Sequence, residues 1–317
     1  MSPLAVCRAQ ALAVWPEERR WLIEGLWADQ AVGIVGGEPK CGKSFLALDL
    51  AVAVASGAPC LRRFRPAQTG RVLLFAAEDA LHVVRRRLEG IARAAAVAFD
   101  SLDIHVITTP VVRLDLDADR RRLLDTVAAF RPTLLVLDPF ARLHGIDENA
   151  AADVAPLLAY LRQLQRDFAT AVVLVHHTRK GAAHLRPGQA LRGSSELHAW
   201  GDSNLYVQRR GDTLLLTVEH RAAPSTTGLA LELRAHGEAL ALHVADLAPG
   251  PLPDRGTPPT PIDRIEHALA NAALPLSLRQ LRQICRLRMA TLCDALTTLR
   301  TDGRVLKAAG GYQLAPR

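Results

Sequence analysis

The sequence predicts an α/β fold with a mostly parallel sheet, followed by a smaller C-terminal module. Three observations predict it. Short runs rich in Val and Leu are continuously hydrophobic, which is typical of strands buried on both faces. Segments with apolar residues three and four positions apart separate these runs and are long enough to be crossover helices. A stretch dense in Pro and Gly, residues 247–261, then ends the regular pattern.

The strands of the parallel sheet are predicted at five apolar runs: residues 31–35, 71–77, 103–107, 133–138 and 171–177. Helical spacing occupies residues 79–97, 117–130 and 151–168. From Ser203 onward, "LYVQRRGDTLLLTVEHR" and "GLALELRAHGEALALHV" alternate around Gly-Asp and His-Gly turns. Such alternation indicates antiparallel strands, which we expect to complete the sheet. The sequence has no internal repeat.

The Pro-rich stretch divides the chain into regions. Residues 1–30 are interpreted as an N-terminal arm, 31–246 as the α/β core, 247–261 as a semi-stiff linker and 262–317 as a separate domain. In that last region, helical patterns in "IDRIEHALANA", "LSLRQLRQIC" and "RMATLCDALTTLRTDGR" precede a hairpin around Gly310 and Gly311. This order of elements is typical of a winged helix-turn-helix.

Composition narrows the classes of protein. The chain of 317 residues is 49% hydrophobic, and it contains no uncharged apolar run of the about 18 residues that a membrane span requires. Its N-terminus resembles no secretory leader, so we expect a cytoplasmic protein with no membrane partner. The five cysteines are scattered, which argues against disulfides and zinc. A formal charge of +7 suits a polyanionic partner, although an arginine-rich composition alone would also explain it.

A phosphate-binding loop follows the first predicted strand. Residues 37–44, "GEPKCGKS", satisfy G-x-x-x-x-G-K-[ST], and a helical pattern starts at Lys43. The backbone N–H groups of such a loop surround a β-phosphate, Lys43 neutralises β- and γ-oxygens, and the Ser44 hydroxyl ligates Mg²⁺. A purely structural glycine turn is disfavoured by this context. We therefore predict ATP and Mg²⁺ as ligands, with nucleotide contacts from Gly37, Glu38, Pro39, Lys40, Cys41, Gly42, Lys43, Ser44 and Phe45. Cys41 itself is interpreted as a small apolar filler.

Polar side chains lie at the ends of three further buried strands. Asp138 follows the apolar run in "LLVLDP" and is the candidate for holding Mg²⁺ through water. Glu78, in "FAAEDA", is the candidate general base, whereas Asp79 beside it is assigned to a helix N-cap. His176 and His177 end "VVLVHH", where a side chain would contact the γ-phosphate and report its loss. Metal ligation by the two histidines is disfavoured because no acidic or Cys partner follows.

As a set, these motifs resemble the RecA-fold ATPases of the hexameric-helicase branch, most closely the plasmid RepA-type replicative helicases. The resemblance covers most of residues 20–235. It rests on "WLIEGL", "GGEPKCGKSFLALDLA", "AAEDA", "LLVLDPFARLHGIDENAAADV", "VVLVHHTRKG" and "LRGSSEL". The resemblance implies a RecA-like core, with Glu78 as catalytic glutamate and His177 as γ-phosphate sensor.

The resemblance also implies single-stranded DNA in the central channel of a homo-oligomer, most simply a ring-shaped hexamer. The residues expected at that channel are Arg179, Lys180, Arg186 and Arg192. In this family, basic residues on a late strand complete the active site of the neighbouring subunit, and "TVEHRAAP" makes Arg221 the candidate arginine finger. This chain has Glu219 where relatives often carry lysine, so one finger is expected; Arg209 and Arg210 are weaker alternatives.

The C-terminal region has its own charge. Residues 251–317 contain ten Arg and Lys against five Asp and Glu, a net charge of +5. The third helix of a winged helix enters the major groove. The residues assigned to DNA contact there are Arg286, Arg288, Thr291, Arg300 and Arg304. Contact with another protein is the alternative.

The sequence thus predicts an ATP hydrolase that acts as a DNA helicase in replication of a mobile element. Two alternatives stay open: a recombination or repair mediator that hydrolyses ATP on DNA without unwinding it, and a nucleotide-gated DNA-binding regulator. A scaffold or loader for another protein is the least favoured class.

Overall fold

The computed structural model describes residues 6–12, 16, 20–178, 195–211, 213–237, 239–245, 261–272, 274–285, 287–308 and 310–315. The chain divides into two compact units, Met1–Pro249 and Gly250–Arg317. The predicted linker, apart from Pro261, lies outside the described residues. Among the helices that the structure describes, none has both the length and the apolar character needed to cross a bilayer.

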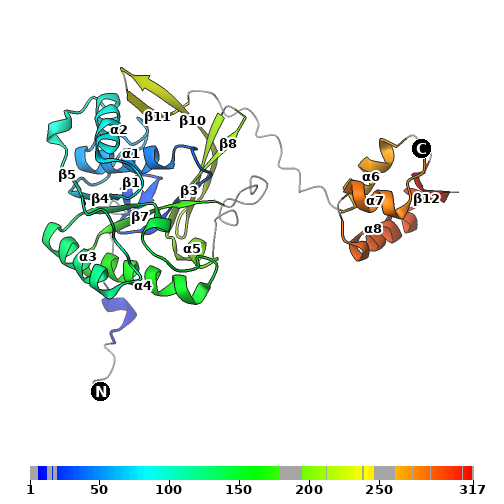
Figure 1. The fold of residues 1–317 in the computed structure, drawn as a ribbon, viewed down its shortest axis with the longest axis horizontal. Coiled ribbons are helices and arrows are strands. Elements are labelled where there is room, and N and C mark those ends of the chain that lie inside the picture. Colours follow the sequence, from blue (N-terminus) through cyan, green and yellow to red (C-terminus); the bar gives the residue numbers. More distant parts are fainter. Residues whose placement is uncertain are drawn as a thin grey trace. The chain divides into compact units, whose positions relative to one another are not determined.

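The described residues of the first unit form one nine-stranded sheet in the order β11-β10-β9-β8-β3-β7-β6-β4-β5 (Figure 1). All pairs from β8 to β5 are parallel, and all pairs from β8 to β11 are antiparallel. The strands are β3 (Val32–Gly37), β4 (Val72–Ala76), β5 (Ile104–Val106), β6 (Leu134–Asp138), β7 (Ala171–His177), β8 (Ser203–Arg210), β9 (Thr213–His220), β10 (Thr226–His236) and β11 (Ala239–Val244). The predicted α/β class with a RecA-like, mostly parallel sheet is confirmed.

Helices cover both faces of this sheet (Figure 1). Helices α1 (Lys43–Ser56) and α2 (Leu81–Ala94) bury Leu and Val side chains in one core layer, and α3 (Asp117–Phe130) and α4 (Ala151–Phe168) do so in the other. The bounds of α3 and α4 are those that the apolar spacing predicts. Because parallel strands are buried on both faces, their continuous hydrophobicity follows from this three-layer arrangement.

Strand β8 corrects the expectation that every strand after Ser203 is antiparallel. It pairs in parallel with β3, with Val35 opposite Leu205. The side chain of Asn204 accepts a hydrogen bond from the Ile34 N–H at 3.1 Å, which ties the two strands together. The chain reaches β8 through the short helix α5 (Ser195–Trp200) and reverses only afterwards, at the turn before β9. Alternation reports which faces are buried, but not the direction of the neighbouring strand.

A short hairpin precedes the sheet, formed by β1 (Trp21–Ile23) and β2 (Trp27–Ala28). Leu22, Ile23, Leu26 and Trp27 are all at most 1% exposed and belong to the core layer of α1 and α2. This part of the predicted N-terminal arm is therefore packed into the first unit. In residues 6–12, by contrast, no side chain is buried.

The second unit contains α6 (Pro261–Ala270), α7 (Leu278–Cys285), α8 (Met289–Thr301), β12 (Val305–Ala308) and β13 (Gly311–Leu314). Leu281, Leu292, Leu299 and Val305 form its core, each at most 1% exposed. Leu276 forms a bridge with Tyr312, next to the hairpin. Three helices and a hairpin follow the predicted order, and the winged helix-turn-helix assignment stays a prediction.

One buried ion pair joins α1 to the loop that follows it. Asp49, on α1, has no exposed surface, and its carboxylate accepts hydrogen bonds from the Leu61 N–H at 2.8 Å and from the Arg62 guanidinium. Leu61 and Arg62 have positive φ values of 51° and 61°. The carboxylate thus fixes a loop conformation that non-glycine residues rarely adopt.

We predict that Asp49→Ala lowers the free energy of unfolding by about 3–5 kcal/mol, because it leaves the Arg62 charge buried and unpaired. The exposed pair Arg122–Asp119 provides a control, and Arg122→Ala should cost less than about 1 kcal/mol. Urea unfolding followed by tryptophan fluorescence measures the first unit alone, since all four tryptophans lie at or before residue 200. Equal losses in the two variants would contradict a structural role for the buried pair.

Candidate active site

The phosphate-binding loop connects the end of β3 to the start of α1. Gly42 is the N-cap of α1, with a φ of 91° that favours glycine and no side-chain hydrogen bond to the free N–H groups of the first turn. A Cβ on Gly37 would lie 2.3 Å from the carbonyl oxygen of Val207, so only glycine allows β3 to approach β8 there. Free N–H groups at a helix N-terminus form an anion-binding site.

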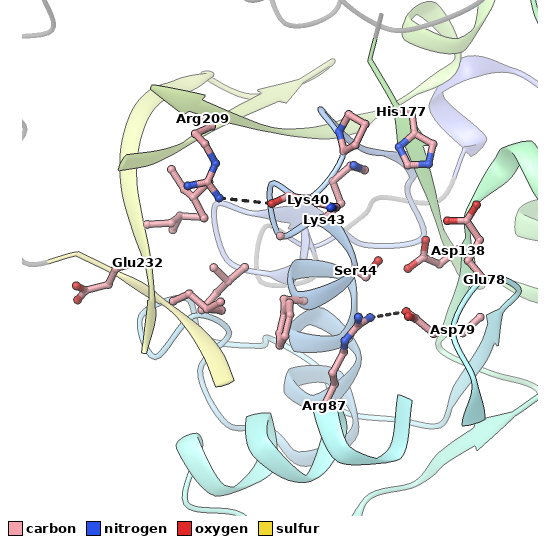
Figure 2. Close-up of a pocket in the computed structure, with 18 of the residues that line it drawn as sticks. Lys40, Lys43, Ser44, Glu78, Asp79, Arg87, Asp138, His177, Arg209 and Glu232 are labelled. Atoms are coloured by element: carbon pink, nitrogen blue, oxygen red, sulfur yellow. Dashed lines mark hydrogen bonds and ion pairs between the residues drawn. The ribbon is translucent and has the colours of Figure 1, made fainter. Parts of the chain in front are cut away.

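Lys43 and Ser44 point into this region from the first turn of α1 (Figure 2). Lys43 is 5% exposed, and its Nζ donates a hydrogen bond to the Glu38 carbonyl oxygen at 2.6 Å. Burial lowers the pKa of the Lys43 ammonium, and nearby acidic groups only partly oppose this. A buried cation with one carbonyl partner is suited to bind a polyanion.

Two carboxylates face the loop from neighbouring strands. The end of β4 lies beside the end of β6, with Ala76 opposite Asp138. Burial raises the pKa of Asp138 to about 6, and a hydrogen bond from Ser44 opposes this shift. Glu78, two residues beyond β4, also lines the cleft, and one of its oxygens accepts a hydrogen bond from the Arg142 Nε at 3.1 Å. Figure 2 shows Ser44, Asp138 and Glu78 on the same side of the cleft.

The two histidines at the end of β7 separate, because successive side chains of a strand point to opposite faces. His177 lies opposite Gly37 in the parallel register and lines the cleft. Its Nδ1 is buried and lacks a hydrogen-bond partner among the described residues, and burial followed by the charge of Lys43 lowers its pKa. His176, at 1% exposed, packs against the Phe140 ring instead. Only His177 is positioned to contact a bound nucleotide.

The cleft has a volume of about 910 Å³. Of the nine predicted nucleotide contacts, six line it: Pro39, Lys40, Gly42, Lys43, Ser44 and Phe45. Cys41 is 1% exposed and packs into the core, where burial raises the pKa of its thiol; this side chain fills space. Gly37 and Glu38 do not line the cleft; Glu38 contributes its carbonyl oxygen to Lys43.

A wall of the cleft was missed by the sequence analysis. Leu214 on β9, Leu231 on β10 and Leu242 on β11 present an apolar surface to the phosphate-binding loop. Sequence alternation identifies these strands, but no local motif connects them to a loop roughly 170 to 200 residues earlier. The wall offers an apolar surface to the less polar part of a nucleotide.

Asp79 differs from its predicted role. The N-cap of α2 is Ala80, without a side-chain hydrogen bond, so the assignment of Asp79 as N-cap is wrong. Asp79 accepts a hydrogen bond from Arg87, one turn and a half into α2, and the Arg87 guanidinium lies 5.1 Å from the centre of the Phe45 ring. This chain of contacts holds α2 against the start of α1 (Figure 2).

The arginine-finger candidates Arg221 and Arg209 lie at opposite ends of the strands. Arg221 follows β9, whose last residue pairs with Ser203 at the start of β8. It donates to the Ala199 carbonyl oxygen at 2.5 Å and lies 3.5 Å from the Asp202 carboxylate. The phosphate-binding loop follows the carboxyl end of β3, at the opposite end of these strands, so Arg221 cannot act on the site of its own chain. Arg209 lines that site and donates to the Lys40 carbonyl oxygen at 3.4 Å.

Several predicted DNA contacts lie outside the described residues: Arg179, Lys180, Arg186, Arg192 and Arg286. In the second unit, Arg288 and Arg300 are exposed at the two ends of α8. Arg304 forms an ion pair with Glu266 at 2.5 Å, so this side chain has an intramolecular partner.

The residues present fit a magnesium–nucleotide complex. Hydroxyl and carboxylate oxygens of Ser44 and Asp138 are the hard ligands that Mg²⁺ prefers, and the His177 side chain lines the same cleft. The fold and this site define a P-loop NTPase. Residues 3–183 match the AAA domain family, which is more than half of the chain, and the protein belongs to this family.

Proposed function

We propose that this protein is a DNA-dependent ATP hydrolase that works as a helicase of the RepA type on single-stranded DNA. The observation that carries the proposal is the convergence of Glu78, Asp138 and His177 on one phosphate-binding loop. In the sequence, His177 is followed at once by Thr178, Arg179 and Lys180. A side chain beside the γ-phosphate thus starts the segment proposed to contact DNA, which favours turnover coupled to DNA over nucleotide binding alone.

The chemistry follows from the positions of these side chains. Lys43 would neutralise the β- and γ-phosphates, while Ser44 and Asp138 would hold Mg²⁺, which would supply charge neutralisation when bound. Glu78 orients a water molecule and accepts its proton as the water oxygen bonds to the γ-phosphorus and the bond to ADP breaks. Loss of the γ-phosphate removes a hydrogen-bond partner of His177, and the end of β7 can then shift.

Catalysis is proposed to require a second copy of the chain. Arg221 and the phosphate-binding loop of the same chain lie at opposite ends of the sheet's strands, so head-to-tail assembly would bring Arg221 to the loop of a neighbour. Heterologous interfaces close into rings or continue as open arrays, and we propose a ring-shaped hexamer with DNA in its channel. A finger in trans is worth about 10³- to 10⁵-fold in rate.

A nucleotide-gated DNA-binding regulator is the second candidate. It is favoured by the separate C-terminal unit, on which Arg279 and Arg282 of α7 are exposed, as are Arg288 and Arg300 of α8. Such a basic surface on three helices and a hairpin suits duplex DNA. Under this alternative, the nucleotide state of the first unit would control binding of duplex by the second.

We predict that single-stranded DNA raises the steady-state rate of ATP hydrolysis by at least about tenfold, because the segment that follows His177 in the sequence is proposed to contact DNA. The measurement compares the full chain with and without a thymidine oligonucleotide at fixed salt, followed by strand displacement on a forked duplex. Stimulation without displacement would favour the recombination or repair mediator. An unchanged rate, with tight binding to one duplex sequence, would refute the helicase and favour the regulator.

We further predict that Arg221→Ala lowers DNA-stimulated hydrolysis by at least about 10³-fold while ATP binding persists. Mixing this variant with Lys43→Ala subunits should restore part of the activity. At mixed interfaces, the intact loop of one variant meets the intact Arg221 of the other. If the mixture is no more active than the sum of the two variants, Arg221 does not act in trans.

A further inference from the structure

Two adjacent carboxylates after β4 are held by arginines from different elements. Asp79 accepts a hydrogen bond from Arg87 on α2. Glu78 accepts one from Arg142, which lies in the short 3₁₀ helix η4 (Phe140–Arg142) directly after β6. No motif in the sequence points to either arginine. The Arg87 contact braces α2 against α1, whereas the Arg142 contact engages the residue proposed as the general base.

The backbone at Arg142 is fixed, but its side chain is accessible. Phe140 is fully buried, and the Arg142 N–H donates to the Pro139 carbonyl oxygen at 3.1 Å, which anchors the turn. The Arg142 side chain is 63% exposed and that of Glu78 is 44% exposed. Arg142 does not line the nucleotide cleft, whereas Glu78 does. The guanidinium therefore reaches Glu78 from outside the cleft.

This contact opposes the action of Glu78 as a base. A general base must direct a free carboxylate lone pair at the attacking water. A carboxylate oxygen that accepts a hydrogen bond from a guanidinium is held in the orientation that this partner sets, and that lone pair is not directed at water. Because both side chains are largely exposed, the pair is weak and can separate readily.

We propose that Arg142 is a positioning residue that holds Glu78 in a resting orientation, and that phosphates of single-stranded DNA release Glu78 by binding Arg142. This inference rests on the proposed function. Guanidinium groups bind phosphate oxygens in bidentate geometry, so a strand of DNA competes well for Arg142. β6, which leads into η4, pairs with β7, which leads into the segment proposed to contact DNA.

The test measures ATP hydrolysis of the full chain without DNA. Arg142→Ala and Arg142→Gln should each raise this rate about two- to fivefold, because this is the change in rate that corresponds to the strength of an exposed ion pair. Stimulation by a thymidine oligonucleotide should fall by the same factor, and the KM for ATP should stay within about twofold. Glu78→Gln in the Arg142→Ala background should remove the gain, since the effect acts through Glu78.

Arg85→Ala is the matched control. Arg85 is also largely exposed and forms an ion pair with Glu89 at 2.8 Å, away from the cleft. It should leave the DNA-free rate unchanged. Thermal unfolding confirms that both Arg142 variants are folded, and a merely structural role would lower the rate instead of raising it.

The outcomes separate the two proposals. If both Arg142 variants hydrolyse ATP no faster than the wild type without DNA, whatever the wild-type rate, the resting contact is refuted. If they are faster but DNA does not stimulate the wild type, Arg142 restrains Glu78 while DNA is not its release, and the second half of the inference is overturned together with the helicase proposal.

Discussion

The parallel register of the central sheet is the constraint on which the site depends. Pairing places Gly37 beside His177 and Ala76 beside Asp138, so the last residues of four parallel strands meet at the carboxyl ends of those strands. Parallel strands require crossover helices, and the first of these, α1, starts at those ends with its N–H groups free. Anion-binding groups and carboxylates are therefore brought together by topology, although 140 positions separate Gly37 from His177. A one-residue register slip between β3 and β7 would turn His177 away from the cleft and His176 toward it.

The electrostatics of the cleft indicate a site adapted to a ligand of high negative charge. Burial disfavours the charged forms of both Lys43 and Asp138, as their shifted pKa values show. Phosphate oxygens would stabilise the ammonium, and a divalent cation would stabilise the carboxylate. Ligand binding thus offsets the free energy that burial of these two charges costs. The favourable binding free energy is therefore concentrated at the phosphates. The apolar wall of Leu214, Leu231 and Leu242 completes the lining of the cleft.

Sequence reasoning succeeded where local pattern determines structure. The parallel strands and the bounds of α3 and α4 follow from hydrophobic periodicity, and the loop before Lys43 follows from glycine spacing. It failed where distant segments meet. Alternation could not show that β8 runs parallel to β3, because pairing direction depends on how α5 returns the chain. Asp79 resembled an N-cap, yet Arg87 competes for its carboxylate. Arg142 reaches Glu78 across 64 positions, and no motif encodes that contact. The roles of Arg221 and of the basic residues after His177 depend on partners that neither periodicity nor spacing describes.

Single-turnover hydrolysis by Glu78→Gln shows whether the cleft at the carboxyl ends of the parallel strands hydrolyses ATP with Glu78 as its base, or only binds nucleotide. With saturating single-stranded DNA and Mg²⁺, the variant should bind ATP within about threefold of the wild-type affinity, because Lys43, Ser44 and Asp138 are intact. It should cleave the bound ATP at least about 10²-fold more slowly, the usual contribution of a general base. Cleavage at the wild-type rate with unchanged affinity would exclude Glu78 as the general base, since the water would then be activated by another group.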